Sequence, residues 1–162
     1  MLLAFVGLIA MVNGMLGGIG GWFGFEGLSL ELILGYIFMP LAFLIGVPWS
    51  EAMVAGSFIG QKIVVNEFVA YLNFAPYLKD VADGGILVEA TGQAMTDRTK
   101  AIISFALCGF ANLSSIAILL GGLGAMAPSR RHDLAKLGVR AVIAASLANL
   151  MSATLAGLFL AI

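Results

Sequence analysis

Long apolar segments alternate with short hydrophilic stretches along the 162 residues of the chain. A helix rises 1.5 Å per residue, so about 20 apolar residues cross a hydrocarbon core of about 30 Å. Hydrophobic residues make up 61% of the chain and charged residues 10%, whereas a soluble domain has about 45–50% and about 25%. The pattern predicts an all-α integral membrane protein with apolar segments at residues 1–24, 28–50, 51–75, 100–126 and 139–162.

The second apolar segment differs from a clean membrane span. It contains Pro40 and ends near Pro48, and proline removes a helical hydrogen bond and kinks or breaks a helix. We therefore expect residues 28–50 to form a kinked helix, or a pair of helices lying at the membrane interface.

Two hydrophilic stretches predict the topology. Residues 76–99 are rich in charges and lie in water, and Thr96 or Asp97 is a suitable N-cap for the helix that follows. Residues 127–138 carry three cations, Arg130, Arg131 and Lys136, against one acid, Asp133. By the positive-inside rule this second stretch is cytoplasmic, which places residues 76–99 outside.

Ionisable groups interrupt the third apolar segment. Lys62 and Glu67 lie near its centre, where a charge costs about 2.5–3.5 kcal/mol on insertion scales. A break near Gly60-Gln61 would convert residues 51–75 into a re-entrant hairpin and place Asn66 and Glu67 at the start of a half-helix, facing a cavity. The alternative is a buried Lys62–Glu67 ion pair that only holds helices together.

The fourth segment is interrupted by Gly109, Asn112, Ser114 and Ser115. Asn112 and Ser115 are three residues apart and share a helix face, and Phe110 lies beside the break. Two interrupted segments point to the midplane site of a secondary transporter, and these groups suit a hydroxyl-rich solute. The alternative reading is that Asn112 and the serines only form bonds between helices.

Charge and cysteine content exclude other classes of protein. The formal net charge is −1, without the basic patch that nucleic acid binding requires. Cys108 is the one cysteine, so no disulfide forms within the chain, and His132, the one histidine, lies in a polar stretch. We expect no metal site, no organic cofactor, no catalytic residues and no enzymatic activity, since no nucleophile and base converge.

Three blocks in the interrupted segments match a known family. They are Gly60-Gln61-Lys62, then Asn66-Glu67-Phe68-Val69-Ala70-Tyr71, and finally Cys108-Gly109-Phe110-Ala111-Asn112-Leu113-Ser114-Ser115-Ile116. In this order they resemble the signature blocks of the concentrative nucleoside transporters, with the greatest similarity to the bacterial branch. The resemblance extends over essentially the whole chain.

The resemblance implies a fold of transmembrane helices with a re-entrant hairpin and a discontinuous helix, which together form one inverted repeat of a secondary transporter. It assigns the segments as follows: 1–24 a scaffold-like transmembrane helix, 28–50 interfacial helices, 51–75 the re-entrant hairpin, 76–99 an extracytoplasmic loop, 100–126 the discontinuous transmembrane helix, 127–138 a cytoplasmic basic loop and 139–162 the final transmembrane helix.

The resemblance also implies a function. Members of the family import nucleosides such as uridine and adenosine by symport with Na⁺ or H⁺, as homotrimers; for this chain we expect a multi-pass protein of the bacterial inner membrane, in contact with lipid. The family's carboxylate that bonds ribose hydroxyls corresponds to Glu67, and its aromatic and ribose-bonding groups correspond to Phe110, Asn112 and Ser115. The neighbouring polar residues Gln61, Lys62, Asn66 and Ser114 are expected to support them.

One part of the family pattern is missing. Members carry an earlier hairpin with a Gly-Gln-Thr-Glu block that reads the base, and nothing in residues 1–50 matches it. We therefore expect the chain to be a C-terminal fragment that supplies the ribose-binding half of the site and is not competent for transport alone. The alternative function is a non-transporting helical membrane protein whose buried polar groups only stabilise helix packing.

Overall fold

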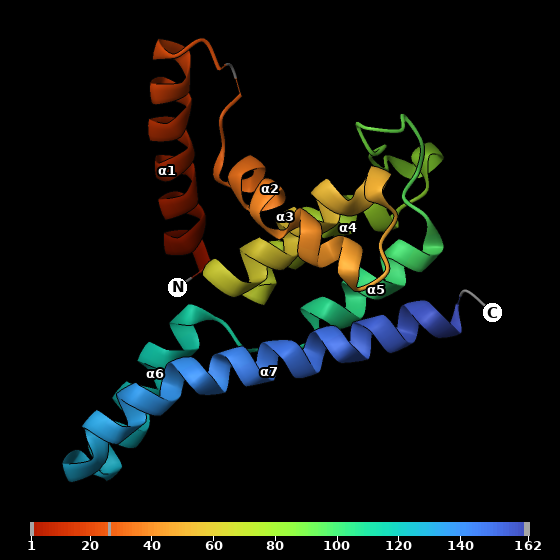
Figure 1. Ribbon diagram of the computed structural model, residues 1–162. Helices are drawn as coiled ribbons and strands as arrows, with labels where there is room; N and C mark the ends of the chain where they lie inside the picture. Colours follow the sequence, from red (N-terminus) through yellow and green to blue (C-terminus); the bar gives the residue numbers. More distant parts are fainter. Residues whose placement is uncertain (1, 26, 161–162) are drawn as a thin grey trace.

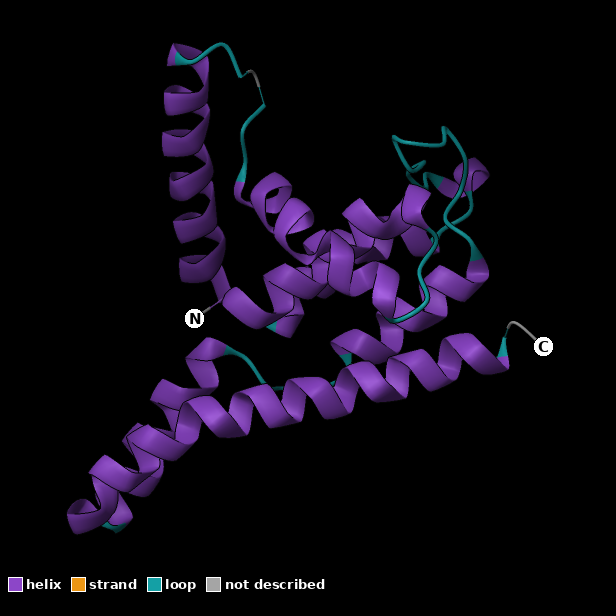
Figure 2. Ribbon diagram, in the orientation of Figure 1, coloured by secondary structure: helices purple, strands orange, loops and turns teal. Residues whose placement is uncertain are grey.

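The computed structural model describes residues 2–25 and 27–160, and these residues are almost entirely helical (Figures 1 and 2). Within them the β-structure amounts to one isolated bridge, between Val88 and Gln93. The helices, in chain order, are α1 (Leu2–Trp22), α2 (Leu30–Leu44), α3 (Trp49–Val64), α4 (Glu67–Leu78), the short 3₁₀ helix η1 (Val81–Asp83), α5 (Asp97–Leu107), α6 (Leu113–Met126), the 3₁₀ helix η2 (Pro128–Arg130) and α7 (Arg131–Phe159). The all-helical fold class is therefore as expected.

Five helices share one hydrophobic core. It lies between α2, α3, α4, α5 and α7, and its fully buried side chains include Phe74, Ile59, Ile102, Ile103 and Leu107. The ring of Phe58 on α3 packs 5.3 Å from that of Phe74 on α4. Outside this core, α1 contacts mainly α2, and α6 packs against α7 away from the centre of the molecule (Figure 1).

Helices α2 and α3 are bent by 117° at the short break between them. The chain does not break at Pro40, because α2 continues through this proline to Leu44. The change of direction comes at residues 45–48, where Gly46 has a φ of +103° and Pro48 precedes α3. A left-handed φ is accessible to glycine at no steric cost, so the turn is made there.

The break in the third apolar segment lies later than expected. Gly60 and Gln61 are inside α3, and a Cβ on Gly60 would lie 2.7 Å from Cβ of Leu34, so this glycine permits close packing of α2 on α3. The chain leaves the helix at Val65 and Asn66 instead. Asn66 has an extended backbone and its side chain caps α4. This cap favours a helix start more strongly than Gly60 favours a helix end.

The fourth segment contains two helices, α5 and α6, separated by residues 108–112. Of the two N-cap residues expected for the first helix, the structure has Thr96, whose hydroxyl accepts from Thr99 N. At the break, Asn149 of α7 donates to the carbonyl oxygen of Ala106 at 3.1 Å. Gly109 is required beside it, because a Cβ there would lie 2.4 Å from Asn149 Nδ2.

The last helix begins at Arg131 rather than at residue 139, so most of the expected basic loop is helical. Pro128 opens the 3₁₀ turn before it, and Arg130 pairs with Asp133 at 2.7 Å across the first turn. Among the described residues, Pro128–Phe159 is the one helix that is long and apolar enough to cross a membrane alone; α2 and α3 together would count as a second, bent span.

Candidate functional site

Two helices begin at the same place, each with an asparagine cap. Asn66 Oδ1 accepts from Val69 N at 2.9 Å at the start of α4, and Asn112 Oδ1 accepts from Ser115 N at 2.8 Å at the start of α6. A helix N-terminus carries unpaired N–H groups and a partial positive charge. The two interrupted segments therefore bring two positive helix ends together.

A direct contact joins the two starts. Asn112 Nδ2 donates to Glu67 Oε2 at 3.0 Å, across 45 residues of sequence. Asn112 is 4% exposed, and its Oδ1 also accepts from Ser114 Oγ at 2.7 Å. Since Oδ1 is occupied by donors, the amide nitrogen is held toward the carboxylate. The bond between helices that the alternative reading expected is present, and its partner is the other principal site residue.

Ser115 and Phe110 complete this group. Ser115 Oγ lies 2.7 Å from the carbonyl oxygen of Phe110 and 2.8 Å from Asn112 Oδ1, so its one proton is given to either acceptor. The Phe110 side chain is exposed and lies at the same cavity. A polar cluster beside an aromatic face can bind a solute that has hydroxyl groups at one end and a flat ring at the other.

The cavity has a volume of about 840 Å³ and is mostly apolar. Its polar side chains are Asn66, Glu67, Asn112, Ser114 and Ser115, all expected from the sequence. Part of its wall was missed, since residues of α7 also line it, namely Gly138, Ala141, Val142 and Ala145. Small residues at 138, 141 and 145 recur at the spacing of one helix face, which is the signal that would have located this wall.

Two supporting residues do not reach the cavity. Gln61 is buried and bonds Ser57 and Asn73, and it lies on a separate hollow between α2, α3 and α4. Lys62 is 2% exposed and lies within electrostatic reach of Glu67, but among the described residues it forms no ion pair within 4.0 Å. The buried Lys62–Glu67 ion pair of the alternative reading is therefore wrong.

The described residues contain no group of three His, Cys, Asp or Glu side chains that could hold a metal ion. The chemistry available at the cavity is hydrogen bonding. A carboxylate accepts, an amide nitrogen donates, and two hydroxyls can do either, at the ends of two helices in an otherwise apolar space. This arrangement, few polar groups placed at one side of an apolar pocket, is that of a site for a small organic molecule.

Broken helices whose N-termini meet at one cavity are the arrangement in which secondary transporters hold their substrates. The profile of the family described as "Na+ dependent nucleoside transporter C-terminus" matches residues 1–157. The chain belongs to this family of nucleoside transporters.

Relatives and solved structures agree with this assignment. The chain is 63% identical over 161 residues to an uncharacterized transporter of Haemophilus influenzae, and 52% identical over 160 residues to the nucleoside permease NupC of Helicobacter pylori; each alignment covers 99% of this chain and 36% of the relative. A structure of CNTnw in an inward-facing substrate-bound state matches with a TM-score of 0.87 and 64% identity, over 98% of this chain and 36% of that one. The relatives are permeases and transporters rather than enzymes, as expected.

The chain spans about a third of the length of the relatives that it matches. The resemblance to concentrative nucleoside transporters is therefore confirmed for the C-terminal part of the family. The family description also names a coupling cation, Na⁺.

Proposed function

We propose that this chain supplies the ribose-binding half of the substrate site in an ion-coupled nucleoside symporter. In this proposal Glu67 accepts bonds from ribose hydroxyls, Asn112 and Ser115 bond the same sugar, and Phe110 contacts the base. The observation that carries the proposal is the meeting of Glu67 and Asn112, 3.0 Å apart, at the rim of one cavity.

The physical chemistry of the group fits a sugar. A pair of adjacent ribose hydroxyls can donate to a carboxylate and accept from an amide, which are the two groups present here. Two helix N-termini, each with a partial positive charge, lie beside this carboxylate at the cavity. A phosphate would face the negative Glu67, so a neutral nucleoside suits the site better than a nucleotide.

The membrane arrangement follows the same proposal. Helices α3 and α4 have 16 and 12 residues, each shorter than the about 20 needed to span, and we infer that they form a re-entrant hairpin. Together with the discontinuous helix α5–α6 it would make one inverted repeat, with α1 as scaffold helix and α2 at the interface. We place the protein in the bacterial inner membrane as a multi-pass homotrimer, with the basic turn before α7 in the cytoplasm.

The part of the relatives that this chain does not match also has a role in this proposal. It would supply the groups that read the base and most ligands of the coupling cation, Na⁺ or H⁺. The chain by itself would then bind only one side of the nucleoside and would not transport.

A chimera tests the proposal. This chain replaces the segment that it matches in NupC of Helicobacter pylori, and uridine uptake is measured in cells that lack nucleoside uptake of their own. Uptake is expected, and Glu67→Gln should abolish it, whereas Glu89→Gln, which changes an exposed carboxylate in the loop before α5, should not.

The alternative is a non-transporting protein in which the Glu67–Asn112 bond only joins two helices. It predicts that Glu67→Gln lowers thermal stability without changing uptake or uridine binding by the purified chimera. That result would overturn the proposal, as would a folded chimera that binds no uridine.

A further inference from the structure

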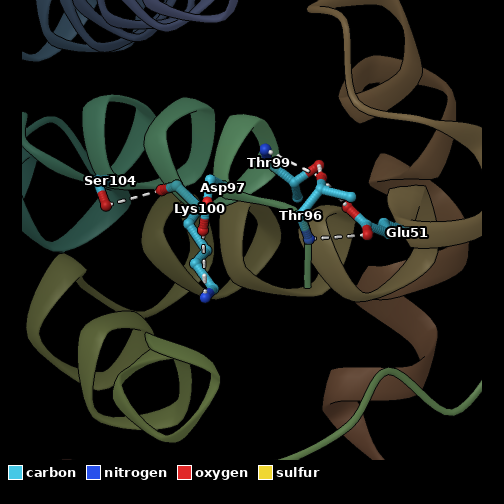
Figure 3. Close-up of polar contacts among 6 residues, drawn as sticks. All are labelled: Glu51, Thr96, Asp97, Thr99, Lys100 and Ser104. Carbon is cyan, nitrogen blue, oxygen red and sulfur yellow. Dashed lines mark hydrogen bonds and ion pairs between the residues drawn. The ribbon is translucent and has the colours of Figure 1, made fainter. Parts of the chain in front are cut away.

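A buried carboxylate, that of Glu51, lies at the ends of α3 and α5 that are farthest from the candidate site. Glu51 is in the first turn of α3 and is 3% exposed. Figure 3 shows its side chain meeting Thr96, the N-cap of α5. Among the described residues the ion pairs are Lys100–Asp97 and Arg130–Asp133, so no cation within 4.0 Å neutralises Glu51.

Both oxygens of Glu51 are occupied by one residue. Thr96 N donates to Oε1 at 3.0 Å, and Thr96 Oγ1 donates to Oε2 at 2.9 Å. In a capping box, the third residue of the same helix reaches back to the N–H of the N-cap. Here the third residue of α5 is Thr99, whose hydroxyl lies 2.9 Å from Thr96 Oγ1, and the carboxylate comes from another helix instead.

The carboxylate therefore lies at two helix N-termini at once, those of α3 and α5. Each N-terminus carries a partial positive charge that favours an anion. A buried carboxylate is costly when it is used only to fill space, and an apolar side chain would pack α3 on α5 without that cost. The two directed bonds fix a distance and an angle that apolar packing would leave adjustable.

The same two helices end at the candidate site. From Glu51, α3 runs about 20 Å to the break before Glu67, and α5 runs about 16 Å from its start to the break before Asn112. The helices are thus joined at one end by Glu51–Thr96 and at the other by Glu67–Asn112. A tilt of about 3° at the first joint moves the far end by about 1 Å, which is enough to weaken a positioned site by up to about a hundredfold.

We propose that Glu51 is a positioning residue for the nucleoside site. By capping α5 from α3, it keeps the two broken segments in register, so that Glu67 and Asn112 present their polar atoms to one substrate and move as one unit. This inference rests on the proposed function, because the contact between Glu51 and Thr96 is argued to act on the nucleoside site.

Four variants of the NupC chimera test this role. Thr96→Ser keeps both donors and should leave the uridine KM within about twofold of the parent, whereas Thr96→Val removes the hydroxyl and should raise KM by about threefold to tenfold. Glu51→Gln weakens the same joint but keeps the cap that the Thr96 hydroxyl gives α5, so it should raise KM in the same direction. Combining it with Thr96→Val should raise KM by less than the two separate effects together. Asp97→Asn is the control, because Asp97 is a carboxylate in the same first turn that is 98% exposed.

Equilibrium uridine binding and thermal unfolding of the purified variants separate positioning from stability. If Glu51→Gln and Thr96→Val lower the unfolding temperature but leave KM and uridine affinity unchanged, the joint is only structural and the inference is wrong. Equal effects of Thr96→Ser and Thr96→Val would also refute it. Should Glu67→Gln abolish uptake while the Glu51 and Thr96 variants leave KM unchanged, only this inference fails; should Glu67→Gln have no effect, the proposed function itself fails.

Discussion

Replacing Asn112 by Asp changes one nitrogen to oxygen at almost constant volume. The side chain keeps Oδ1, which still caps α6 and accepts from Ser114 and Ser115. Its second oxygen then faces Glu67 Oε2, at the 3.0 Å now occupied by the hydrogen bond between them. The variant therefore removes the contact between the two broken segments and leaves the helix cap in place.

The size of the effect follows from two contributions. A hydrogen bond to a charged group is worth about 1.5–3 kcal/mol, and two like unit charges 4 Å apart repel by about 4 kcal/mol at an effective dielectric constant of about 20. The side chains will separate, and the introduced carboxyl group can take up a proton, so only part of this sum is felt. We expect uridine affinity to fall by about 3 kcal/mol near neutral pH, which is about 150-fold, because the bound sugar loses the Asn112 amide donor and meets a Glu67 carboxylate that the repulsion has displaced.

The assay is equilibrium binding of uridine to the purified chimera, which is independent of the driving ion gradient. Protonation of the introduced carboxyl group removes the repulsion and restores a donor, so the affinity of Asn112→Asp relative to the parent should rise as the pH falls from about 8 to about 5. An affinity equal to that of the parent at neutral pH would refute the reasoning. So would a loss that is the same at both ends of the pH range, since it would not come from charge.

Two further predictions concern the break in the fourth segment and its neighbours. Gly109→Ala would place a Cβ 2.4 Å from Asn149 Nδ2, so overpacking should cost about 1–3 kcal/mol and lower the thermal unfolding temperature. Gly121→Ala is the control, because nothing lies within 4 Å of its new Cβ. Equal unfolding temperatures of the two variants would contradict this account. Tyr71→Phe removes the bond from the Tyr71 hydroxyl to Ser104 O at 2.8 Å. It should lower the free energy of unfolding by about 1 kcal/mol in denaturant unfolding. An unchanged unfolding midpoint would contradict this prediction.

The polar residues of the cavity could be predicted from the sequence because such residues are rare within apolar membrane segments. A carboxylate, two asparagines and two serines within apolar segments are costly unless something satisfies them. Glu67, Asn112 and Ser115 were found in this way, and the structure brings them to one cavity. The sequence cannot say which partner satisfies each group, and so Lys62 was paired with Glu67 in one reading although the structure pairs Glu67 with Asn112.

Helix boundaries were harder to predict, for a physical reason. Gly60 weakens a helix by itself, but in the folded protein its missing side chain lets Leu34 approach, and packing gains more than the helix loses. Pro40 likewise lies within a continuous helix, because tertiary contacts outweigh local preference. The basic stretch before the last apolar segment is helical since α7 starts at Arg131, where charges are tolerated outside the core.

Composition and the positions of polar residues were enough to predict the environment of this protein and the kind of solute that it would bind. Its excess of apolar residues predicts a bilayer as solvent, and the polar residues within its apolar segments, together with the family resemblance, predict a hydroxyl-bearing solute. The packing of the helices sets which polar atoms meet: Glu67 with Asn112 at one end of α3 and α5, and Glu51 with Thr96 at the other. Each of these pairs is 45 residues apart, and contacts at that separation depend on how whole helices pack, which no local pattern encodes.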